Sequence, residues 1–92
     1  MKTKFTELLG IKYPIVQGAM AWVSDGELAA AVSEAGGAGT IAAAGREAAW
    51  VTEQIKEAKQ ITDQPIGVNI MLMADNRDQI VDAVCEAGVK YV

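Results

Sequence analysis

An apolar loop follows the first apolar run of the chain, and its composition suggests that it covers a ligand. It runs from Gln17 to Trp22 and reads QGAMAW, where a surface loop would ordinarily be polar. Gly18 lets a second surface approach the backbone closely, and the three residues after it offer small or soft apolar contacts to a planar ring. The pattern is consistent with a ligand contact, and physical reasoning alone does not favour it over the alternative. The alternative is a loop that packs on the rim of the fold, with Trp22 covering the first long helix.

A primary amide lies late in the clearest strand pattern of the chain. Asn69 belongs to the run 66–72, whose near-continuous apolar character is what a strand buried on both faces requires. A buried amide needs hydrogen-bond partners, and it offers a donor and an acceptor that match the edge of a heterocycle such as a flavin. We therefore predict that Asn69 binds a ligand, the alternative being an amide bonded to neighbouring backbone. Met71 either fills a gap or lines the same cleft.

Other candidate sites are better explained by structural roles. Histidine is absent and Cys85 is the single cysteine, which excludes a zinc site, a nucleophile–histidine pair and an internal disulfide. Cys85 is expected to pack on a buried helix face, and Arg46 to be an ordinary surface charge. The glycines of Gly36–Gly39 follow a helix and open a strand, which is the reverse of a dinucleotide fingerprint. No metal site is expected from the acidic residues Asp75, Asp78 and Asp82.

Composition excludes several classes of partner. The chain has 92 residues and a net charge of −4, so it lacks the basic footprint of a protein that binds nucleic acid or a membrane surface. No signal peptide or spanning helix is predicted, and a lone cysteine fits a reducing compartment. We expect a cytoplasmic protein.

The elements that must position these residues alternate between strand and helix. Strands are predicted at 13–17, 39–43, 66–72 and 90–92, and helices from Ser24 to Ala35, from Arg46 to Ile61 and from about Asn76 to Ala87. The strands recur at intervals of about 25 residues, the length of one strand-plus-helix unit. This alternation predicts an α/β fold with parallel strands. The pattern alone leaves open a (β/α)8 barrel or a doubly wound sheet.

Helix-period patterns predict which side chains these helices bury. Ser24 and Glu27 have the spacing of a capping box at the start of the first of them. The predicted buried positions are Leu28, Val32 and Ala35 in the first helix, Val51, Ile55 and Ala58 in the second, and Ile80, Val81, Val84 and Cys85 in the third.

The chain resembles the family of FMN-dependent enoyl-acyl-carrier-protein reductase II and nitronate monooxygenase. The resemblance covers all 92 residues and rests on a combination of segments. These are Thr6–Ile11, Tyr13–Gly18, Met20–Trp22, Leu28–Gly37 and Gly67–Leu72. The pairing of Met20–Trp22 with Asn69–Leu72 is closer to the reductase branch.

The resemblance implies that residues 1–92 are the N-terminal part of a single FMN-binding TIM (β/α)8 barrel domain. They would supply about three to three and a half strand–helix units and end within the fourth strand. In the family the loop after the first strand lies against the flavin, and the asparagine matching Asn69 binds it. The implied cofactor-binding residues are Gly18, Ala19, Met20, Ala21, Asn69 and Met71. Ala19 departs from the glycine common in relatives, and its methyl group would crowd the ring.

The implied reaction is hydride transfer from NADH or NADPH through FMN to the enoyl thioester of acyl-carrier protein or CoA. The catalytic histidine and the phosphate site of the family lie later in the barrel, so no catalytic residue is expected in this chain, which should lack turnover alone. We expect a homo-oligomer. Two alternatives remain open: oxidation of alkyl nitronates by O2, and a non-catalytic α/β fragment that self-associates.

Overall fold

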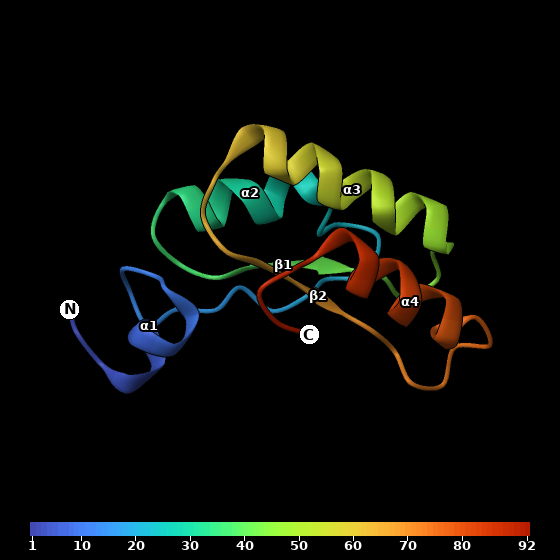
Figure 1. The fold of residues 1–92 in the computed structure, drawn as a ribbon, viewed down its shortest axis with the longest axis horizontal. Helices are drawn as coiled ribbons and strands as arrows, with labels where there is room; N and C mark the ends of the chain where they lie inside the picture. The colour runs from blue at the N-terminus through green and yellow to red at the C-terminus, as the bar shows by residue number, and fades with distance from the viewer.

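The computed structural model describes all 92 residues and contains four helices and two strands. The helices are α1 Lys4–Leu9, α2 Gly26–Glu34, α3 Ala48–Ile61 and α4 Arg77–Ala87, and the strands are β1 Gly39–Ala42 and β2 Ile66–Asn69. Figure 1 shows α2 and α3 side by side above the strands. No helix combines the length and the apolar character that crossing a bilayer requires.

The two strands pair in parallel, as the alternation predicts, with Gly39 opposite Ile66 and Ala42 opposite Asn69. Two further segments extend the sheet by one parallel bridge each, Val16 with Ala38 and Tyr91 with Gly67. The strands predicted at 13–17 and 90–92 are therefore reduced to single bridges, and the strand predicted at 66–72 ends at Asn69. Each outer segment has a neighbour on one side only, so nothing holds it extended beyond the bridge.

The core lies between the strands and the helices. Its fully buried side chains include Ile41 of β1, Val68 of β2 and Ile80 of α4. Val51, Ile55 and Ala58 of α3 are all 0% exposed, which confirms the face predicted for that helix.

The buried face predicted for α2 is wrong. Leu28 and Val32 are only partly buried and Ala35 is exposed, whereas the buried positions are Gly26, Ala29, Ala30 and Ser33. The reason is that the main chain of α2 lies very close to the main chains of β1 and α3. A Cβ on Gly26 would overlap the main chain of Gln54, so only small residues fit there.

The buried face predicted for α4 is half right. Ile80 and Val84 are buried, but Val81 is 39% exposed and Cys85 is also exposed. Helix α4 packs mainly against α3, so the side of it that faces away from α3 has no element over it. Val81 and Cys85 instead line an apolar hollow of about 340 Å³ that extends to Asn69.

Helix α1 was not predicted from the sequence. Thr3 and Thr6 form a reciprocal capping box, in which each side chain accepts from the backbone N–H of the other. Gly10 ends the helix in the left-handed conformation, with φ of 72°. The chain then passes beneath α2 toward the strands (Figure 1).

Tyr91 crosses the sheet on the face that the helices leave uncovered. Its ring lies directly over Gly67, where a Cβ would overlap it. Its hydroxyl donates to the carbonyl of Gly39 at 2.9 Å and lies 2.8 Å from Oγ1 of Thr40. Burial raises the pKa of the Tyr91 phenol, and its hydrogen bond with Thr40 acts in the opposite sense but more weakly.

This raised pKa predicts a loss of stability in alkaline solution. The unfolded phenol loses its proton near pH 10, while the folded phenol still holds it. The contribution of Tyr91 is therefore fully present below pH 10 and declines as the pH rises toward its folded pKa. Urea unfolding measured between pH 8.5 and about pH 11 should show that the free energy of unfolding falls as the pH rises. This fall should be smaller in Tyr91→Phe. An equal decline in both proteins would show that Tyr91 is not its source.

Candidate functional site

Three loops meet where the parallel strands end, and we call this end of the sheet the carboxyl edge. The loops comprise residues 17–25, 43–47 and 70–76. The carbonyl of Ser24 accepts from the N–H of Ala42 at 2.9 Å, and that of Asn69 accepts from the N–H of Ala43 at 3.1 Å. The first loop and Asn69 therefore lie on the two sides of the end of β1. In parallel α/β folds this is the end where ligands bind.

Gln17 fixes the first loop, a role that the sequence analysis missed. Its Oε1 accepts from the N–H of Thr40 at 3.0 Å, and its Nε2 lies 3.3 Å from the carbonyl of Thr40 and 3.0 Å from Oγ of Ser24. The side chain thus pairs with β1 where the main chain of the first segment leaves the sheet. The signal was present, because Gln17, like Asn69, is a primary amide in an apolar run.

Ser24 has a different role from the one predicted. Asp25 caps α2, accepting from the N–H of Leu28 at 2.9 Å, so the predicted capping box of Ser24 and Glu27 is wrong. Ser24 is 2% exposed, and its Oγ accepts from the N–H of Met20 at 2.9 Å. Because Ser24 points into the loop, it holds the loop closed and leaves the cap to its neighbour.

Replacing Gln17 by leucine should destabilise the chain by about 1–3 kcal/mol. Leucine is similar in size but leaves the N–H of Thr40, a residue only 7% exposed, without a partner. Urea unfolding followed by circular dichroism measures the change. Gln60→Leu, on the exposed side of α3, is the matched control and should change stability by less than about 0.5 kcal/mol. Equal effects of the two substitutions would contradict the role given to Gln17.

The predicted contact residues of the first loop are largely open to solvent. Met20 is 45% exposed, Gly18 and Ala21 are also exposed, and Ala19 is partly buried. A Cβ built on Gly18 would meet no atom within 4 Å, and the φ of Gly18 lies outside the left-handed region. Neither crowding nor backbone conformation within the chain therefore explains a glycine at position 18.

Asn69 and Met71 lie on the other side of β1. The side-chain amide of Asn69 is exposed and has no hydrogen-bond partner in the chain, so it is free to bind a ligand. Met71 is 50% exposed and opens on a separate hollow of about 430 Å³ between the second and third loops. The structure thus brings the first loop and Asn69 to one edge and places Met71 further out along it.

The prediction that Arg46 is an ordinary surface charge is wrong. Its guanidinium carbon lies 4.3 Å from the centre of the Trp22 ring and 4.2 Å from that of the Trp50 ring. The side chain is partly buried, and its Nε is fully buried without a partner. These contacts connect the first loop, the second loop and α3, and no local pattern could indicate the pairing of Arg46 with Trp22.

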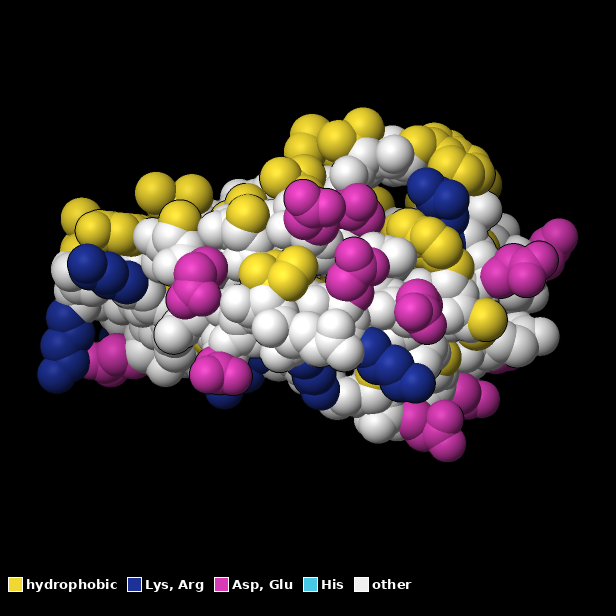
Figure 2. Space-filling model, turned by 90° about the horizontal axis from the view of Figure 1, so that it is seen from above, with side chains coloured by type: hydrophobic (Ala, Val, Ile, Leu, Met, Phe, Trp, Pro, Cys, Tyr) yellow, Lys and Arg dark blue, Asp and Glu magenta, His cyan; other side chains and the backbone are white.

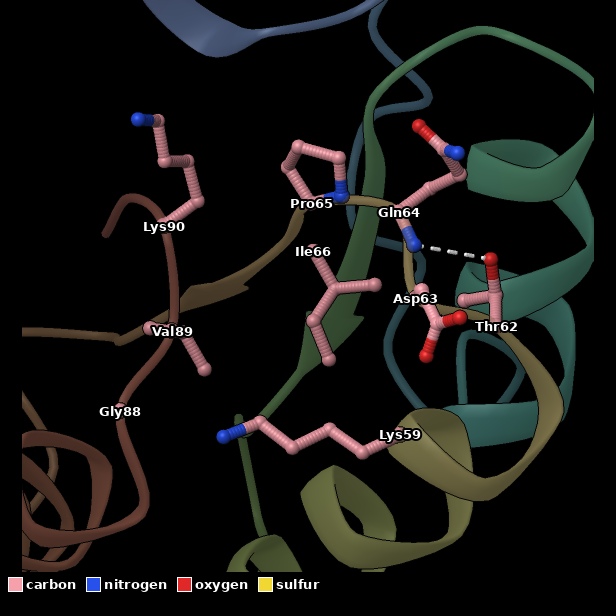
Figure 3. Close-up of a pocket in the computed structure, with 9 residues that line it drawn as sticks. All are labelled: Lys59, Thr62, Asp63, Gln64, Pro65, Ile66, Gly88, Val89 and Lys90. Carbon is pink, nitrogen blue, oxygen red and sulfur yellow. Dashed lines mark hydrogen bonds between the residues drawn. The ribbon is translucent and has the colours of Figure 1, made fainter.

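A different hollow, of about 330 Å³, lies at the opposite end of the strands (Figure 3). Its lining includes Lys59 and Lys90, and the dashed line in Figure 3 marks the N–H of Gln64 donating to Oγ1 of Thr62. Lys59 Nζ donates to the carbonyl of Ala87 at the end of α4, where a cation is favourable. We assign this hollow a structural role, because this end of a barrel serves stability.

The residues at the carboxyl edge fit a flat heterocycle better than a metal ion. Open space beside Gly18 admits a ring against the loop backbone, and the free amide of Asn69 can both donate to and accept from a ring edge. No three side chains of histidine, cysteine, aspartate or glutamate lie close enough to share a metal ion.

Comparison with known proteins shows what the chain is similar to. A family model described as nitronate monooxygenase matches residues 2–90. The structure of FabK from Thermotoga maritima matches with a TM-score of 0.94 and 43% identity, covering 97% of this chain and 29% of that one. A nitronate monooxygenase of Pseudomonas aeruginosa is 49% identical over 70 residues, which are 76% of this chain and 20% of the relative.

A third relative also matches over nearly the whole chain. It is the (3aS,4S,5R,7aS)-5-hydroxy-7a-methyl-1-oxo-octahydro-1H-indene-4-carboxyl-CoA dehydrogenase of Mycobacterium tuberculosis, 37% identical over 90 residues, which are 98% of this chain and 25% of the relative. The chain spans about a quarter of the length of these proteins. Its parallel α/β fold matches the N-terminal part of the TIM barrel of FabK, which confirms the predicted fold.

Proposed function

We propose that this chain, which belongs to the nitronate monooxygenase family, forms the part of an oxidoreductase barrel that holds the ring of FMN. The arrangement at the carboxyl edge carries the proposal. The open backbone beside Gly18 and the free amide of Asn69 lie on the two sides of the end of β1. A tricyclic ring resting across that end would contact both.

Each residue of the edge has a distinct part in this proposal. The backbone from Gly18 to Ala21 lies along the ring, and the amide of Asn69 bonds the polar edge of the ring. Met20 and Met71 exclude water from beside it with soft apolar side chains. Hydride transfer between a nicotinamide and a substrate is the chemistry that bound FMN supplies.

The reaction that we favour is reduction of an enoyl thioester, carried on acyl-carrier protein or CoA, with NADH or NADPH as the reductant. The likeness to FabK supports it, because the match covers 97% of this chain at a TM-score of 0.94. The relative of Mycobacterium tuberculosis is named for a CoA thioester, which agrees with the thioester class.

Oxidation of alkyl nitronates by O2 is the second candidate. It is favoured by the match to the family model and by the 49% identity to the Pseudomonas aeruginosa enzyme over 70 residues. A full-length polypeptide that contains residues 1–92 should be assayed with NADH or NADPH and a crotonyl thioester, and separately with a nitronate under air. Turnover of the thioester supports the reductase, whereas turnover of the nitronate alone rejects it.

A barrel chimera tests the flavin contact separately from the reaction. In this chimera, residues 1–92 replace the matching segment of Thermotoga maritima FabK, which supplies the rest of the barrel. We expect it to purify with bound FMN and to lose that FMN when Asn69 is replaced by alanine. Gln60→Ala, on the exposed side of α3, is the control for amide removal. A chimera that folds without flavin would contradict the proposal.

We also expect the 92-residue chain to self-associate when it is alone. It exposes large apolar side chains, among them Ile15, Leu72 and Met73 at 62%, 74% and 88%. Figure 2 shows hydrophobic side chains gathered along one long edge, while charged side chains are spread over the helices. Sedimentation velocity should show dimers or larger species that Leu72→Lys reduces. A monomer at all concentrations would contradict this expectation.

A further inference from the structure

The first loop holds a conformation that its own residues do not favour. Trp22 has φ of 68° and is the single residue other than glycine with a positive φ. A left-handed conformation costs such a residue about 1–2 kcal/mol, so it persists only where other contacts compensate. Trp22 is 66% exposed, so burial in the core does not provide this compensation.

The side chain of Arg46 provides the missing contact. Its guanidinium carbon lies 4.3 Å from the ring centre of Trp22 and 4.2 Å from that of Trp50. Trp50 belongs to α3 and packs against the core, so it is the fixed part of the group. A guanidinium against an indole face is favourable, and more so when it is shielded from water. We call this group the Trp22–Arg46–Trp50 clamp.

Neighbouring residues leave the clamp little room to rearrange. A Cβ on Gly45 would lie 2.7 Å from the Trp22 ring, so the ring rests directly on the backbone of the second loop. The carbonyl of Arg46 accepts from Nδ2 of Asn76 at 3.0 Å, which connects the third loop as well. Arg46 has no carboxylate within salt-bridge distance, so no ion pair competes for its guanidinium.

We infer that Arg46 is a positioning residue, which holds residues 18–23 in the conformation that presents their backbone along the carboxyl edge. Its consequence for cofactor binding rests on the proposed function, whereas the restraint on the loop does not. The loop has internal reporters of that restraint, since the N–H groups of Met20, Val23 and Ser24 all donate hydrogen bonds within it.

Amide hydrogen exchange of the 92-residue chain tests the restraint. We expect Arg46→Gln to speed exchange at Met20, Val23 and Ser24 about tenfold, with exchange in β1 and α3 unchanged. Arg46→Lys, which keeps the charge but not the planar group, should give exchange rates between those of the parent and those of Arg46→Gln. Lys56→Gln removes a charge from the exposed side of α3 and should change none of these rates.

Tryptophan fluorescence gives a second readout, applied to variants whose circular dichroism matches that of the parent. Trp22 and Trp50 are the only tryptophans in the chain, and both belong to the clamp. In a Trp50→Phe background, Arg46→Gln should make Trp22 emission easier to quench with acrylamide. Unchanged loop exchange together with unchanged quenching would overturn the inference.

The barrel chimera separates this inference from the proposed function. Faster loop exchange together with weaker FMN binding in Arg46→Gln supports both. Faster exchange with unchanged FMN affinity supports the restraint and counts against the flavin contact. If Arg46→Gln also exposes β1 and α3, Arg46→Lys replaces it, and equal loop exchange in Arg46→Lys and the parent would again overturn the inference.

Discussion

Replacing Gly18 by valine should leave the stability of the chain unchanged, within about 0.5 kcal/mol, and remove flavin from the barrel chimera. No atom lies within 4 Å of the position where a Cβ would be built, so the fold has room for the new side chain. The backbone conformation of Gly18 does not require glycine either. Valine also lowers the conformational entropy of the unfolded chain, which offsets any small loss of stability in the folded state.

The same open space is what the flavin ring would fill. An isopropyl group there would separate the ring from the loop backbone and from the amide of Asn69. We expect FMN affinity to fall at least about a hundredfold, which corresponds to ~2.7 kcal/mol. The FMN content of the purified chimera and a fluorescence titration measure this loss.

The controls for Gly18→Val separate added bulk from its location. Gly18→Ala should reduce affinity by a smaller factor, and Ala31→Val on the exposed face of α2 should not change it. If the chimera with valine at position 18 keeps its FMN, the first loop does not lie against the ring. If Gly18→Val lowers the stability of the chain in the absence of flavin, the fold itself needs this space.

Replacing Gly39 by alanine should destabilise the chain by about 3 kcal/mol or more and move its urea unfolding midpoint well below that of the parent. A Cβ there would overlap the carbonyl oxygen of Ala29 and lie 2.6 Å from its carbonyl carbon. Both are main-chain atoms of α2, so the helix itself would have to move. If α2 moved, the N–H of Gly39 would lose the hydrogen bond that it donates to the buried Oγ of Ser33 at 2.9 Å.

The chain has little stability to lose. At about 0.05–0.15 kcal/mol per residue, a domain of this size is stable by roughly 5–14 kcal/mol, and its small core should place it at the low end. Urea unfolding followed by circular dichroism tests the prediction. Gly18→Ala makes the same chemical change where space is open, so it should unfold like the parent. Equal midpoints for Gly39→Ala and Gly18→Ala would show that α2 does not approach β1 so closely.

Local patterns determined a large part of this structure. The alternation of strand and helix predicts the parallel α/β fold, because each unit must bury a strand beneath the helix that follows it. Helix periodicity identifies Val51, Ile55 and Ala58 as the buried face of α3, because their spacing of four and three residues places all three side chains on one side of the helix. Gly36, with φ of 110°, follows the end of α2 as predicted.

Local patterns could not predict the features that depend on neighbouring elements. The buried face of α2 consists of small residues because β1 and α3 approach it closely, and hydrophobicity alone selects the larger Leu28 and Val32. The outer strands are reduced to bridges because each has one neighbour only.

The candidate site divides in the same way. The sequence by itself indicates an apolar loop and an amide at the ends of two strands. Only the tertiary structure pairs Gln17 with Thr40, turns Ser24 into the loop and places Arg46 beside Trp22 and Trp50. The contacts of Gln17 with Thr40 and of Arg46 with Trp22 join residues more than 20 positions apart, and such a spacing carries no periodic signal. The sequence thus determines what lies at the carboxyl edge, while packing between loops decides how it is held.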